Sequence, residues 1–454
     1  MAGEPADDGH VEGHRAAAKC LNGVTMKLAV AGLMMSIALV AAGCSSSDDA
    51  PETSASPTTA GGTGAVTVPD AYTGLILTPI GDPTFPFPGT DGKYHVAYDL
   101  QLTNATPVPA TLDKLDVVDG TDPSKVIASF SGAALVEPNC PYGDCNRLRM
   151  LTAPAATSTA IPPQETRILF VDYTFDSLDQ APKAVLHHLY GSAAAAPSSR
   201  EPSPVDYLIT ALDIDAGTPR VISSPLKGDN WIALNGCCLP GFPHRTSPLP
   251  VDGKINNSQR FAIDWKRTND QGEFYTGDRT KNESYVDYGS DVYAVADGTV
   301  VATLDNVPAN APGTLPAEVP ELAAKLTVEN VDGNHVVLDL GGGVYAMYAH
   351  FIEGSLLVKP GDKVSKGDTL AKLGNTGNAN ASHLHFQLMN GPSLLYADSL
   401  PYVFDSFEYE GQVAPQQILD ADDYLSGQFL QGKLPTGEPR TDELPSNLAI
   451  VDFG

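Results

Sequence analysis

Residues 374–387 read GNTGNANASHLHFQ, a loop rich in glycine and asparagine that continues into an alternating segment. Polar and apolar residues alternate with period two from His383 to Leu388, which is typical of a β-strand. On such a strand His383, His385 and Gln387 lie on one face. Two imidazoles on that face can share a small site, one as a metal ligand and the other as a base. The alternative is a pair of exposed polar residues on a sheet surface.

Length and composition limit the classes of protein that fit this chain. With 454 residues, we expect two folded domains with tails. The formal net charge is -28 and is spread along the sequence, so nucleic acid and anionic lipid are poor partners. The content of 42 glycines and 37 prolines favours strands and turns over helices. We therefore expect a mainly β protein with no nucleic-acid partner.

The N-terminal segment predicts export. Residues 26–42 combine a lysine near their start with an apolar run that is too short for a comfortable membrane span and typical of a signal-peptide core. Residues 41–44, AAGC, resemble a bacterial lipobox, whose cysteine is lipidated and becomes the mature N-terminus. The lipobox pattern prefers leucine where this sequence has Ala41. A plain secretory signal is the alternative to lipidation of Cys44.

The domain boundaries follow from these patterns. We expect a signal peptide with a lipobox over residues 1–43 and a disordered tether over 44–67, where serine, threonine, alanine, proline and glycine cannot bury a core. A β-sandwich accessory domain is expected over 68–218, a second folded domain over 219–410 and a C-terminal tail over 411–454. The protein would then be anchored in the cell membrane through lipid on its N-terminus and would face the cell wall or periplasm.

Besides Cys44, the mature part contains two close pairs of cysteines, which are candidates for disulfides in an exported chain: Cys140, Cys145, Cys237 and Cys238. Four cysteines leave the connectivity open. A direct bond between Cys237 and Cys238 would be strained, so we expect the two pairs to be cross-linked and to connect the two domains. A zinc site built from the four cysteines is the alternative.

The accessory domain has an all-β pattern. Residues 94–104 and 167–175 alternate, and turn dipeptides such as Asp119-Gly120 separate the strands. Strands at this spacing predict an immunoglobulin-like sandwich. We find no catalytic constellation in this domain and expect it to be a spacer or a binding module.

The second domain contains further alternating segments. Residues 260–265 place Phe261, Ile263 and Trp265 toward the core, with Arg260, Ala262 and Asp264 on the opposite face. Residues 292–302 predict a hairpin with Asp-Gly at its turn. Residues 344–350 predict a strand on which Tyr348 and His350 share a face.

Four motifs occur here in a fixed order: DYGSDVYAVADGTVV, GNHVVLDLGGGVYAMYAHF, VKPGDKVSKGDTLAKLGNTGN and SHLHFQL. Together they resemble the lysostaphin-type, or LytM-type, zinc metallopeptidases, over residues 236–409. The resemblance implies a duplicated hybrid motif, which is a folded antiparallel sheet. It also implies one Zn2+ per chain and hydrolysis of peptide cross-links in peptidoglycan.

The resemblance also implies roles for individual residues. Asp264 and His385 would be zinc ligands, and His350 and His383 would be the catalytic histidines that flank the reacting water. A catalytic zinc takes three nitrogen or oxygen ligands and leaves a position open for water, and an imidazole can accept that water's proton. Further candidates for contacts with the substrate are Tyr348, Asn375 and Arg260.

The sequence departs from the family pattern at Arg260, where the family's His-x-x-x-Asp motif has its first histidine. Arg260 would share a strand face with Asp264, so a salt bridge could occupy the carboxylate. His244, in the proline-flanked PHRTSP segment, is our candidate for the third metal ligand, and His335 is another. If neither binds metal, the chain is a degenerate member that binds peptidoglycan or activates another hydrolase.

The segment VKPGDKVSKGDTLAKLG also resembles hairpins of biotinyl carriers and sugar phosphotransferases. The missing Met-Lys-Met hairpin argues against a carrier, and the export signal argues against a phosphotransferase. The sequence therefore predicts a lipid-anchored metalloendopeptidase of the cell envelope that acts on peptidoglycan.

Overall fold

The computed structural model describes residues 66–68, 70–81, 84–136, 146–151, 155–194, 203–214, 217–414, 417 and 428–454. These residues belong to one compact unit. The expected signal peptide, the tether with Cys44, and the pair Cys140 and Cys145 lie outside the described residues. Among the residues described, no helix is long and apolar enough to span a membrane.

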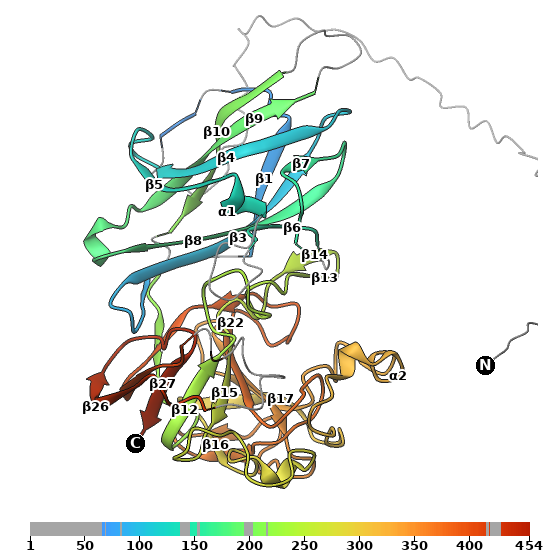
Figure 1. Cartoon of the computed structure of the whole chain (residues 1–454), viewed down its shortest axis with the longest axis vertical. Coiled ribbons are helices and arrows are strands. Elements are labelled where there is room, and N and C mark those ends of the chain that lie inside the picture. Colours follow the sequence, from blue (N-terminus) through green and yellow to red (C-terminus); the bar gives the residue numbers. More distant parts are fainter. Residues whose placement is uncertain are drawn as a thin grey trace, which may run out of the picture. The chain divides into compact units, whose positions relative to one another are not determined.

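The described chain is mainly β, as the sequence predicts. Besides the helical residue Gln417, the helices of the described chain are single turns that lie between strands (Figure 1). These turns are α1 (Ala133–Val136), α2 (Pro320–Ala323), η1 (Leu178–Gln180), η2 (Asn282–Ser284) and η3 (Pro316–Glu318).

Two antiparallel sheets form in the N-terminal part of the described chain. The first has the order β1 (Leu75–Ile80), β3 (Tyr94–Asn104), β8 (Thr166–Phe175) and β6 (Leu148–Arg149), with β2 (Phe87–Pro88) paired to β3. The second has the order β10 (Ser203–Asp213), β9 (Ala184–Ala193), β4 (Ala110–Asp119) and β5 (Val126–Ser131), with β7 (Ala160–Ile161) paired to β4.

The inward faces of these two sheets meet in a single hydrophobic cluster. It joins Val96 and Leu100 from the first sheet to Leu115 and Leu189 from the second. Successive side chains of a strand point to opposite faces of the sheet, so one face of each sheet can cover the other. A β-sandwich, below called the sandwich, therefore forms where the sequence predicts one. Its immunoglobulin-like topology stays a prediction.

The rest of the described chain is organised around one antiparallel sheet of 11 strands, below called the main sheet (Figure 1). Its order is β20 (Lys363–Val364), β17 (Gly298–Leu304), β18 (Asn334–Asp339), β19 (Tyr345–Phe351), β22 (Leu384–Met389), β15 (Ile263–Arg267), β12 (Gly228–Leu234), β27 (Ala449–Phe453), β25 (Phe407–Gln412) and β26 (Lys433–Arg440), with β23 (Ser399–Leu400) paired to β22.

Three two-stranded ladders complete the described strands. They are the parallel pair β11 (Arg220–Ile222) and β24 (Tyr402–Phe404), and the antiparallel pairs β13 (Leu249–Val251) with β14 (Lys254–Asn256) and β16 (Asp291–Tyr293) with β21 (Thr369–Lys372). The hairpin expected over residues 292–302 is therefore wrong. Its two strands, β16 and β17, pair with other strands and belong to different sheets, and the Asp-Gly turn joins the two sheets.

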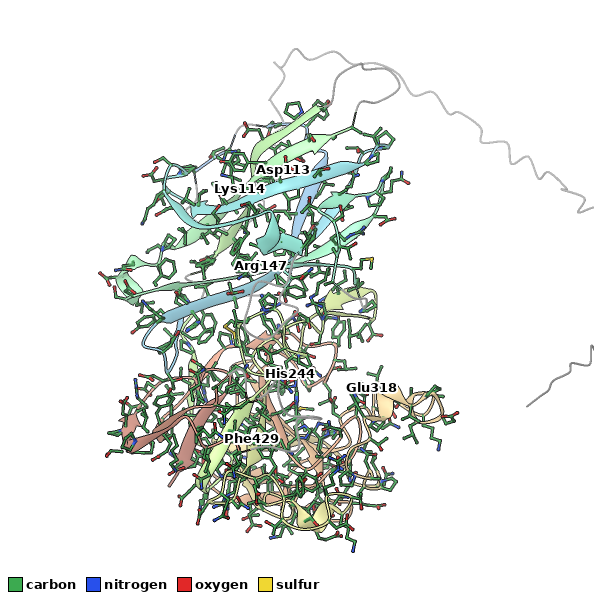
Figure 2. All side chains as sticks on the ribbon, in the orientation of Figure 1. Asp113, Lys114, Arg147, His244, Glu318 and Phe429 are labelled. Carbon is green, nitrogen blue, oxygen red and sulfur yellow. A yellow bond between two sulfur atoms is a disulfide. The ribbon has the colours of Figure 1, made fainter. Side chains whose placement is uncertain are left out.

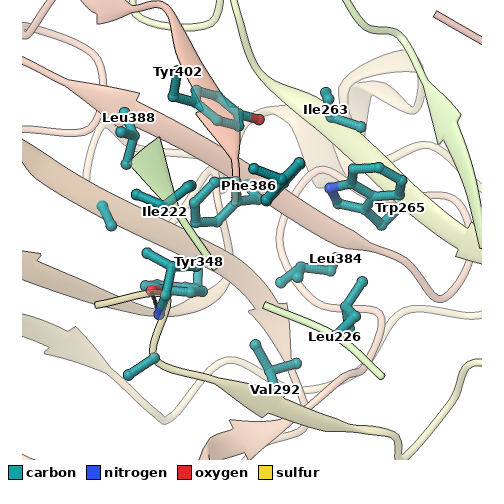
Figure 3. Close-up of a cluster of buried hydrophobic side chains, with 14 of the residues drawn as sticks. Ile222, Leu226, Ile263, Trp265, Val292, Tyr348, Leu384, Phe386, Leu388 and Tyr402 are labelled. Carbon is teal, nitrogen blue, oxygen red and sulfur yellow. Dashed lines mark hydrogen bonds between the residues drawn. The ribbon is translucent and has the colours of Figure 1, made fainter. Parts of the chain in front are cut away.

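A large apolar core covers one face of the main sheet (Figure 3). Ile263 and Trp265 are fully buried there, as their alternation predicts. Phe386 makes edge contacts with Tyr348 and Tyr402, at centroid distances of 5.1 and 5.4 Å. Tyr348 is fully buried and its hydroxyl accepts the Val295 N–H at 3.0 Å. The expectation that Tyr348 contacts substrate is therefore wrong, because its side chain belongs to the core.

The C-terminal residues correct a second expectation. A loosely ordered tail is predicted over 411–454, but β26 and β27 are strands of the main sheet, and β27 pairs with β12 and β25. Phe429 (labelled in Figure 2) stacks on Phe274 at a centroid distance of 4.4 Å, so this stretch is also packed. The sequence signal is weak because prolines and glycines surround both strands.

Candidate metal centre

Asp264 and His385 lie on neighbouring strands of the main sheet. Asp264 on β15 is the direct cross-strand partner of His385 on β22. Directly opposed residues of an antiparallel pair point to the same face of the sheet. The His385 Nδ1 atom is 3.0 Å from Oδ1 of Asp264. The strand register alone therefore brings these two predicted ligands together.

His244 reaches the same point from the turn-rich segment between β12 and β13 (labelled in Figure 2). Its Nε2 atom lies 3.3 Å from Oδ2 of Asp264, and its ring meets the His385 ring at a right angle, with centroids 4.7 Å apart. The three residues offer ligand atoms that all lie within 4.8 Å of one another. His335, the other candidate, lies outside this group.

Hydrogen bonds on the outer nitrogens determine which nitrogen of each ring can bind a metal. Nδ1 of His244 donates to the Ala262 carbonyl at 3.1 Å, so Nε2 of the neutral ring keeps its lone pair. In His385 the roles are reversed, since Nε2 faces Oε1 of Gln387 at 2.9 Å and Nδ1 is hydrogen-bonded to Oδ1 of Asp264 at 3.0 Å. In both rings the nitrogen near Asp264 is the one that would face a metal. Such outer contacts are typical of metal-binding histidines.

Asn235 supports the carboxylate and was missed by the sequence analysis. Its Nδ2 atom donates to Oδ2 of Asp264 at 2.7 Å. Its φ of 57° lies in the left-handed region, which asparagine tolerates better than most residues. The Asn-Gly dipeptide after an apolar strand is the signal that could have identified this turn. The contact fixes the orientation of Asp264 on β15 from the residue that follows the end of β12.

The two remaining predicted histidines lie beside this group. Nδ1 of His383 donates to the Ala381 carbonyl at 2.9 Å, and its Nε2 is 3.4 Å from Oδ1 of Asp264. Nδ1 of His350 donates to the Thr376 carbonyl at 2.8 Å. The His350 ring centroid lies 4.5 Å from that of His383 and 5.9 Å from that of His385. Both rings therefore keep an unprotonated Nε2 when neutral.

A β-bulge turns His350 toward these histidines. His335 of β18 pairs with Ala349 and Asn334 pairs with Phe351, so His350 is an extra residue in β19. Its φ of 71° is in the left-handed region, as occurs at bulges. The expectation that Tyr348 and His350 share a face is wrong, because the bulge interrupts the alternation between them.

Burial and neighbouring charges set the electrostatics of the centre. Burial opposes ionisation of Asp264, but the charges of His244 and His383 outweigh it and hold the pKa of Asp264 well below its usual value. Burial lowers the pKa of His350 well below that of free histidine, and the charges of His383 and His385 lower it further. The centre therefore combines an ionised carboxylate with a neutral His350 near pH 7.

Arg260 does not enter the metal centre. It is 2% exposed and lies in a turn before β15. Its Nε atom donates to Oδ2 of Asp99 in the sandwich at 2.9 Å, and Nη2 donates to the Ile80 carbonyl at 3.0 Å. The expected pairing with Asp264 and the expected contact with substrate are both wrong. The alternation does not extend to Arg260 because the chain is not yet in the strand.

Asn375 is also a structural residue. It is fully buried, and its amide donates to Oδ1 of Asn282 at 3.0 Å and to the Asn310 carbonyl at 3.3 Å. These contacts hold two loops against the glycine-rich segment. A substrate cannot reach a side chain with no exposed surface, so the expected role for Asn375 is wrong.

Asp332 is a buried carboxylate near the centre that the sequence analysis passed over. It is 5% exposed, and Oδ2 has no hydrogen-bond partner among the described residues. Burial raises its pKa, while the charges of His385 and His335 act in the opposite direction. In the sequence, Asp332-Gly333 has the form of an ordinary turn, so only packing distinguishes it.

The disulfide pattern differs from the expected cross-pairing. Cys237 and Cys238 are bonded to each other, in the same segment that carries His244. The cross-linking of these two residues to Cys140 and Cys145 is therefore wrong. The sequence argument failed because it excluded a bond between adjacent cysteines on grounds of strain alone.

Comparison with known proteins agrees with the expected family. Residues 284–395 match the model of peptidase family M23. This range includes His350, His383 and His385 and leaves out His244 and Asp264. The peptidoglycan DD-endopeptidase ShyA of Vibrio cholerae serotype O1 is 32% identical over 101 residues, which cover 22% of this chain and 18% of ShyA. The chain thus spans less than a fifth of that relative.

Solved structures give weaker similarities. The catalytic domain of lysostaphin from Staphylococcus simulans is 23% identical, with 34% of this chain and 80% of that chain covered and a TM-score of 0.19. A zinc-containing peptidase from Vibrio cholerae is 16% identical, with 72% and 86% covered and a TM-score of 0.23. At these TM-scores neither structure supports an argument about function.

Proposed function

We propose that this chain, which contains a domain of peptidase family M23, is a zinc-dependent endopeptidase of the cell envelope that hydrolyses peptide cross-links in peptidoglycan. The observation that carries the proposal is the convergence of His244, Asp264 and His385 on one point, with ligand atoms within 4.8 Å of one another. The similarity to a peptidoglycan endopeptidase supports the substrate class.

The donor set fits zinc. Two imidazole nitrogens and one carboxylate make the combination of nitrogen and oxygen ligands found in catalytic zinc sites, which keep a fourth position open. Each of the three groups also makes a hydrogen bond to a neighbouring residue. Nδ1 of His244 contacts the Ala262 carbonyl, Nε2 of His385 contacts Gln387, and Oδ2 of Asp264 accepts from Asn235. Asp264 is ionised and one nitrogen of each ring faces it. The three groups can therefore supply the negative charge and, once the rings are deprotonated, the lone pairs that a divalent cation requires.

When bound, zinc polarises a peptide carbonyl and brings the pKa of a water to about 7. His383 and His350 provide the proton transfers around it. Each presents an unprotonated Nε2, because Nδ1 donates to the carbonyl of Ala381 or Thr376. Either ring can accept a proton from the attacking water and return it to the leaving amine.

Burial assists this role of His350. A histidine that stays neutral near pH 7 keeps a base available, and burial favours the neutral ring. The left-handed backbone at His350 fixes the ring in the direction of His383. Strained backbone of this kind is often found at functional sites. Both observations support a catalytic rather than a packing role for His350.

Metal content and digestion of purified cell walls test the proposal in wild type and three variants. Wild type should contain about one zinc per chain. His385→Ala should lose zinc, and His244→Ala should bind it more weakly, since each removes one ligand. His383→Ala should keep zinc but lose activity by roughly 100-fold or more, because its role is proton transfer.

A matched control is His188→Ala in the sandwich, which removes a histidine that pairs with Asp206. This variant should keep both zinc and activity. Wild type that binds no zinc would contradict the proposal, and so would full activity in His383→Ala.

A further inference from the structure

His244 and Arg245 are adjacent in the chain but serve two different parts of the protein. His244 faces the metal centre, with Nε2 at 3.3 Å from Asp264. Arg245 is fully buried and extends into the sandwich. There Nη1 donates to Asp99, and Nη2 donates to the carbonyls of Tyr98 and Val171 at 3.0 and 3.1 Å.

Arg245 also closes its own segment. Its Nε atom donates to the Cys238 carbonyl at 3.1 Å, so one guanidinium joins the start of the segment to two strands of the sandwich. The ring of Phe170 lies 4.9 Å from its central carbon. A planar guanidinium with several fixed donors suits such a forked anchor, which a flexible lysine cannot reproduce.

Asp99 on β3 is the centre of this contact. It is fully buried and accepts hydrogen bonds from Arg245, from Arg260 at 2.9 Å and from Asn257 at 2.7 Å. All three donors belong to the part of the chain that carries the metal centre. Two buried guanidinium groups thus share one carboxylate across the contact between the sandwich and the metal-binding part.

Other contacts of the segment that carries His244 include hydrogen bonds from Asn257 to the Arg245 carbonyl and from Ser247 to Asn257, both at 3.3 Å, and the burial of Cys238 and Phe242. Residues 237–248 form turns rather than a strand, so no ladder sets their position. The His244 ring itself makes one hydrogen bond outside the centre, to Ala262. A ligand on such a segment depends on the side chains that hold the backbone beside it.

We propose that the sandwich positions the third metal ligand, with Asp99 and Arg245 as the positioning pair that holds His244 at the centre. This inference rests on the proposed function, since it requires His244 to bind metal. It gives the accessory domain a definite role, because the main sheet alone supplies only Asp264 and His385. The sandwich then holds in place a ligand, His244, that like Asp264 lies outside the region that matches the peptidase family.

Arg245→Gln is the direct test, because it removes the anchor and leaves Asp99 balanced by Arg260 alone. The remaining one-to-one pair keeps the buried charges matched, so the fold should persist. Zinc affinity, measured by competition with a chelator, should fall by about tenfold or more. The visible spectrum of the cobalt-substituted protein should shift toward that of His244→Ala, since both variants lose the same ligand.

Arg260→Gln is the matched control. It removes the other guanidinium from the same carboxylate but leaves Arg245 in place, so zinc affinity should stay within about threefold of wild type. Arg245→Lys keeps the charge balance of wild type, and its affinity should lie between those of wild type and Arg245→Gln. If Arg245→Gln does not fold, the zinc affinity of Arg245→Lys tests the proposal instead: a lower affinity than that of wild type supports it, and an equal affinity contradicts it.

The outcomes separate this inference from the proposed function. If Arg245→Gln is folded and binds zinc like wild type while His244→Ala loses affinity, the positioning role is wrong and the ligand set stands. If His244→Ala also binds zinc like wild type, the ligand set itself is wrong. An equal loss in Arg260→Gln and Arg245→Gln would mean that the contact with the sandwich acts on stability and not on His244.

Discussion

The backbone carbonyl of Thr376 accepts a hydrogen bond from Nδ1 of His350 at 2.8 Å. This contact joins the glycine-rich loop before β22 to the bulged end of β19. It also determines that Nε2 of His350 is the nitrogen available to the metal centre. The Thr376 hydroxyl accepts the Asn334 N–H at 2.9 Å and donates to the Phe351 carbonyl at 3.1 Å, so the loop holds both sides of the bulge.

This loop depends on a glycine that has no room for a side chain. Gly377 has a φ of 71°, and a Cβ there would lie 2.1 Å from the Gly333 nitrogen. Gly377→Ala should therefore lower the free energy of unfolding by at least about 3 kcal/mol, since strain and a backbone clash add. Denaturant unfolding of the purified chain measures this difference.

Gly342→Ala is the control for backbone strain. Gly342 has a similar φ of 68°, but a Cβ there would meet nothing within 4 Å. The cost should be only that of a left-handed alanine, about 1 kcal/mol. If both variants lose the same free energy of unfolding, the backbone near Gly333 moves away from the new Cβ without an energetic penalty.

Substitutions of Asn235 can separate two effects: the hydrogen bond of its side chain to Asp264 and the strain of its left-handed backbone. Asn235→Gly keeps the left-handed backbone but removes the amide that donates to Asp264. We expect the free energy of unfolding to stay nearly constant and the zinc affinity to fall by roughly tenfold. Chelator competition and denaturant unfolding on the same samples measure the two effects.

Asn235→Ala removes the same amide and adds the strain of a left-handed alanine. Its zinc affinity should match that of Asn235→Gly, while its free energy of unfolding should be lower by about 1 kcal/mol. If the glycine variant binds zinc as wild type does, the amide does not orient Asp264 in the bound protein.

Period-two alternation predicted the part of the centre that lies on strands. Asp264 and His385 face the same side because each belongs to a regular strand, and the two strands pair in register. His244, which lies beside Asp264, was predicted as a ligand for a different reason, since the family motif is altered at Arg260 and another histidine was sought on a nearby loop. The mainly β fold followed from composition and from the same alternation.

The expectations that failed concern places where the strand geometry is interrupted. The bulge at His350 reverses the face that alternation assigns relative to Tyr348. The turn before β15 lets Arg260 leave toward Asp99, a residue more than one hundred positions earlier in the chain. The paired strands β12 and β27 are still further apart in sequence. Local patterns carry no information about such contacts, because packing of remote segments determines them.

Membrane attachment gives a prediction that lies outside the described residues. The apolar run followed by Ala-Gly-Cys and a stretch rich in serine and threonine predicts a lipid on Cys44. Cys44→Ala should release the protein from the membrane fraction into the soluble envelope fraction or the medium. Fractionation of cells that express the wild type and the variant tests this. Continued sedimentation of the variant with membranes would mean that another element anchors the chain.

His187 makes the sandwich sensitive to acid. It is fully buried, donates from Nδ1 to the Thr210 carbonyl at 2.7 Å and accepts the Tyr98 hydroxyl at Nε2 at 2.9 Å. Burial lowers the pKa of His187 from 6.5 to about 4, although the bond to Thr210 acts in the opposite direction. The folded protein therefore keeps this ring neutral at a pH where the unfolded chain has already bound a proton.

The sign of the effect follows from this difference in proton binding. Between pH 6.5 and about 4 the unfolded state binds more protons at His187, so the free energy of unfolding falls as the pH falls through this range. The loss should be on the order of 3 kcal/mol. His187→Gln keeps a donor for Thr210 and an acceptor for Tyr98 but does not titrate. Denaturant unfolding from pH 7 downward should show a smaller loss for this variant than for wild type. Equal pH dependence in wild type and His187→Gln would show that His187 is protonated in the folded sandwich.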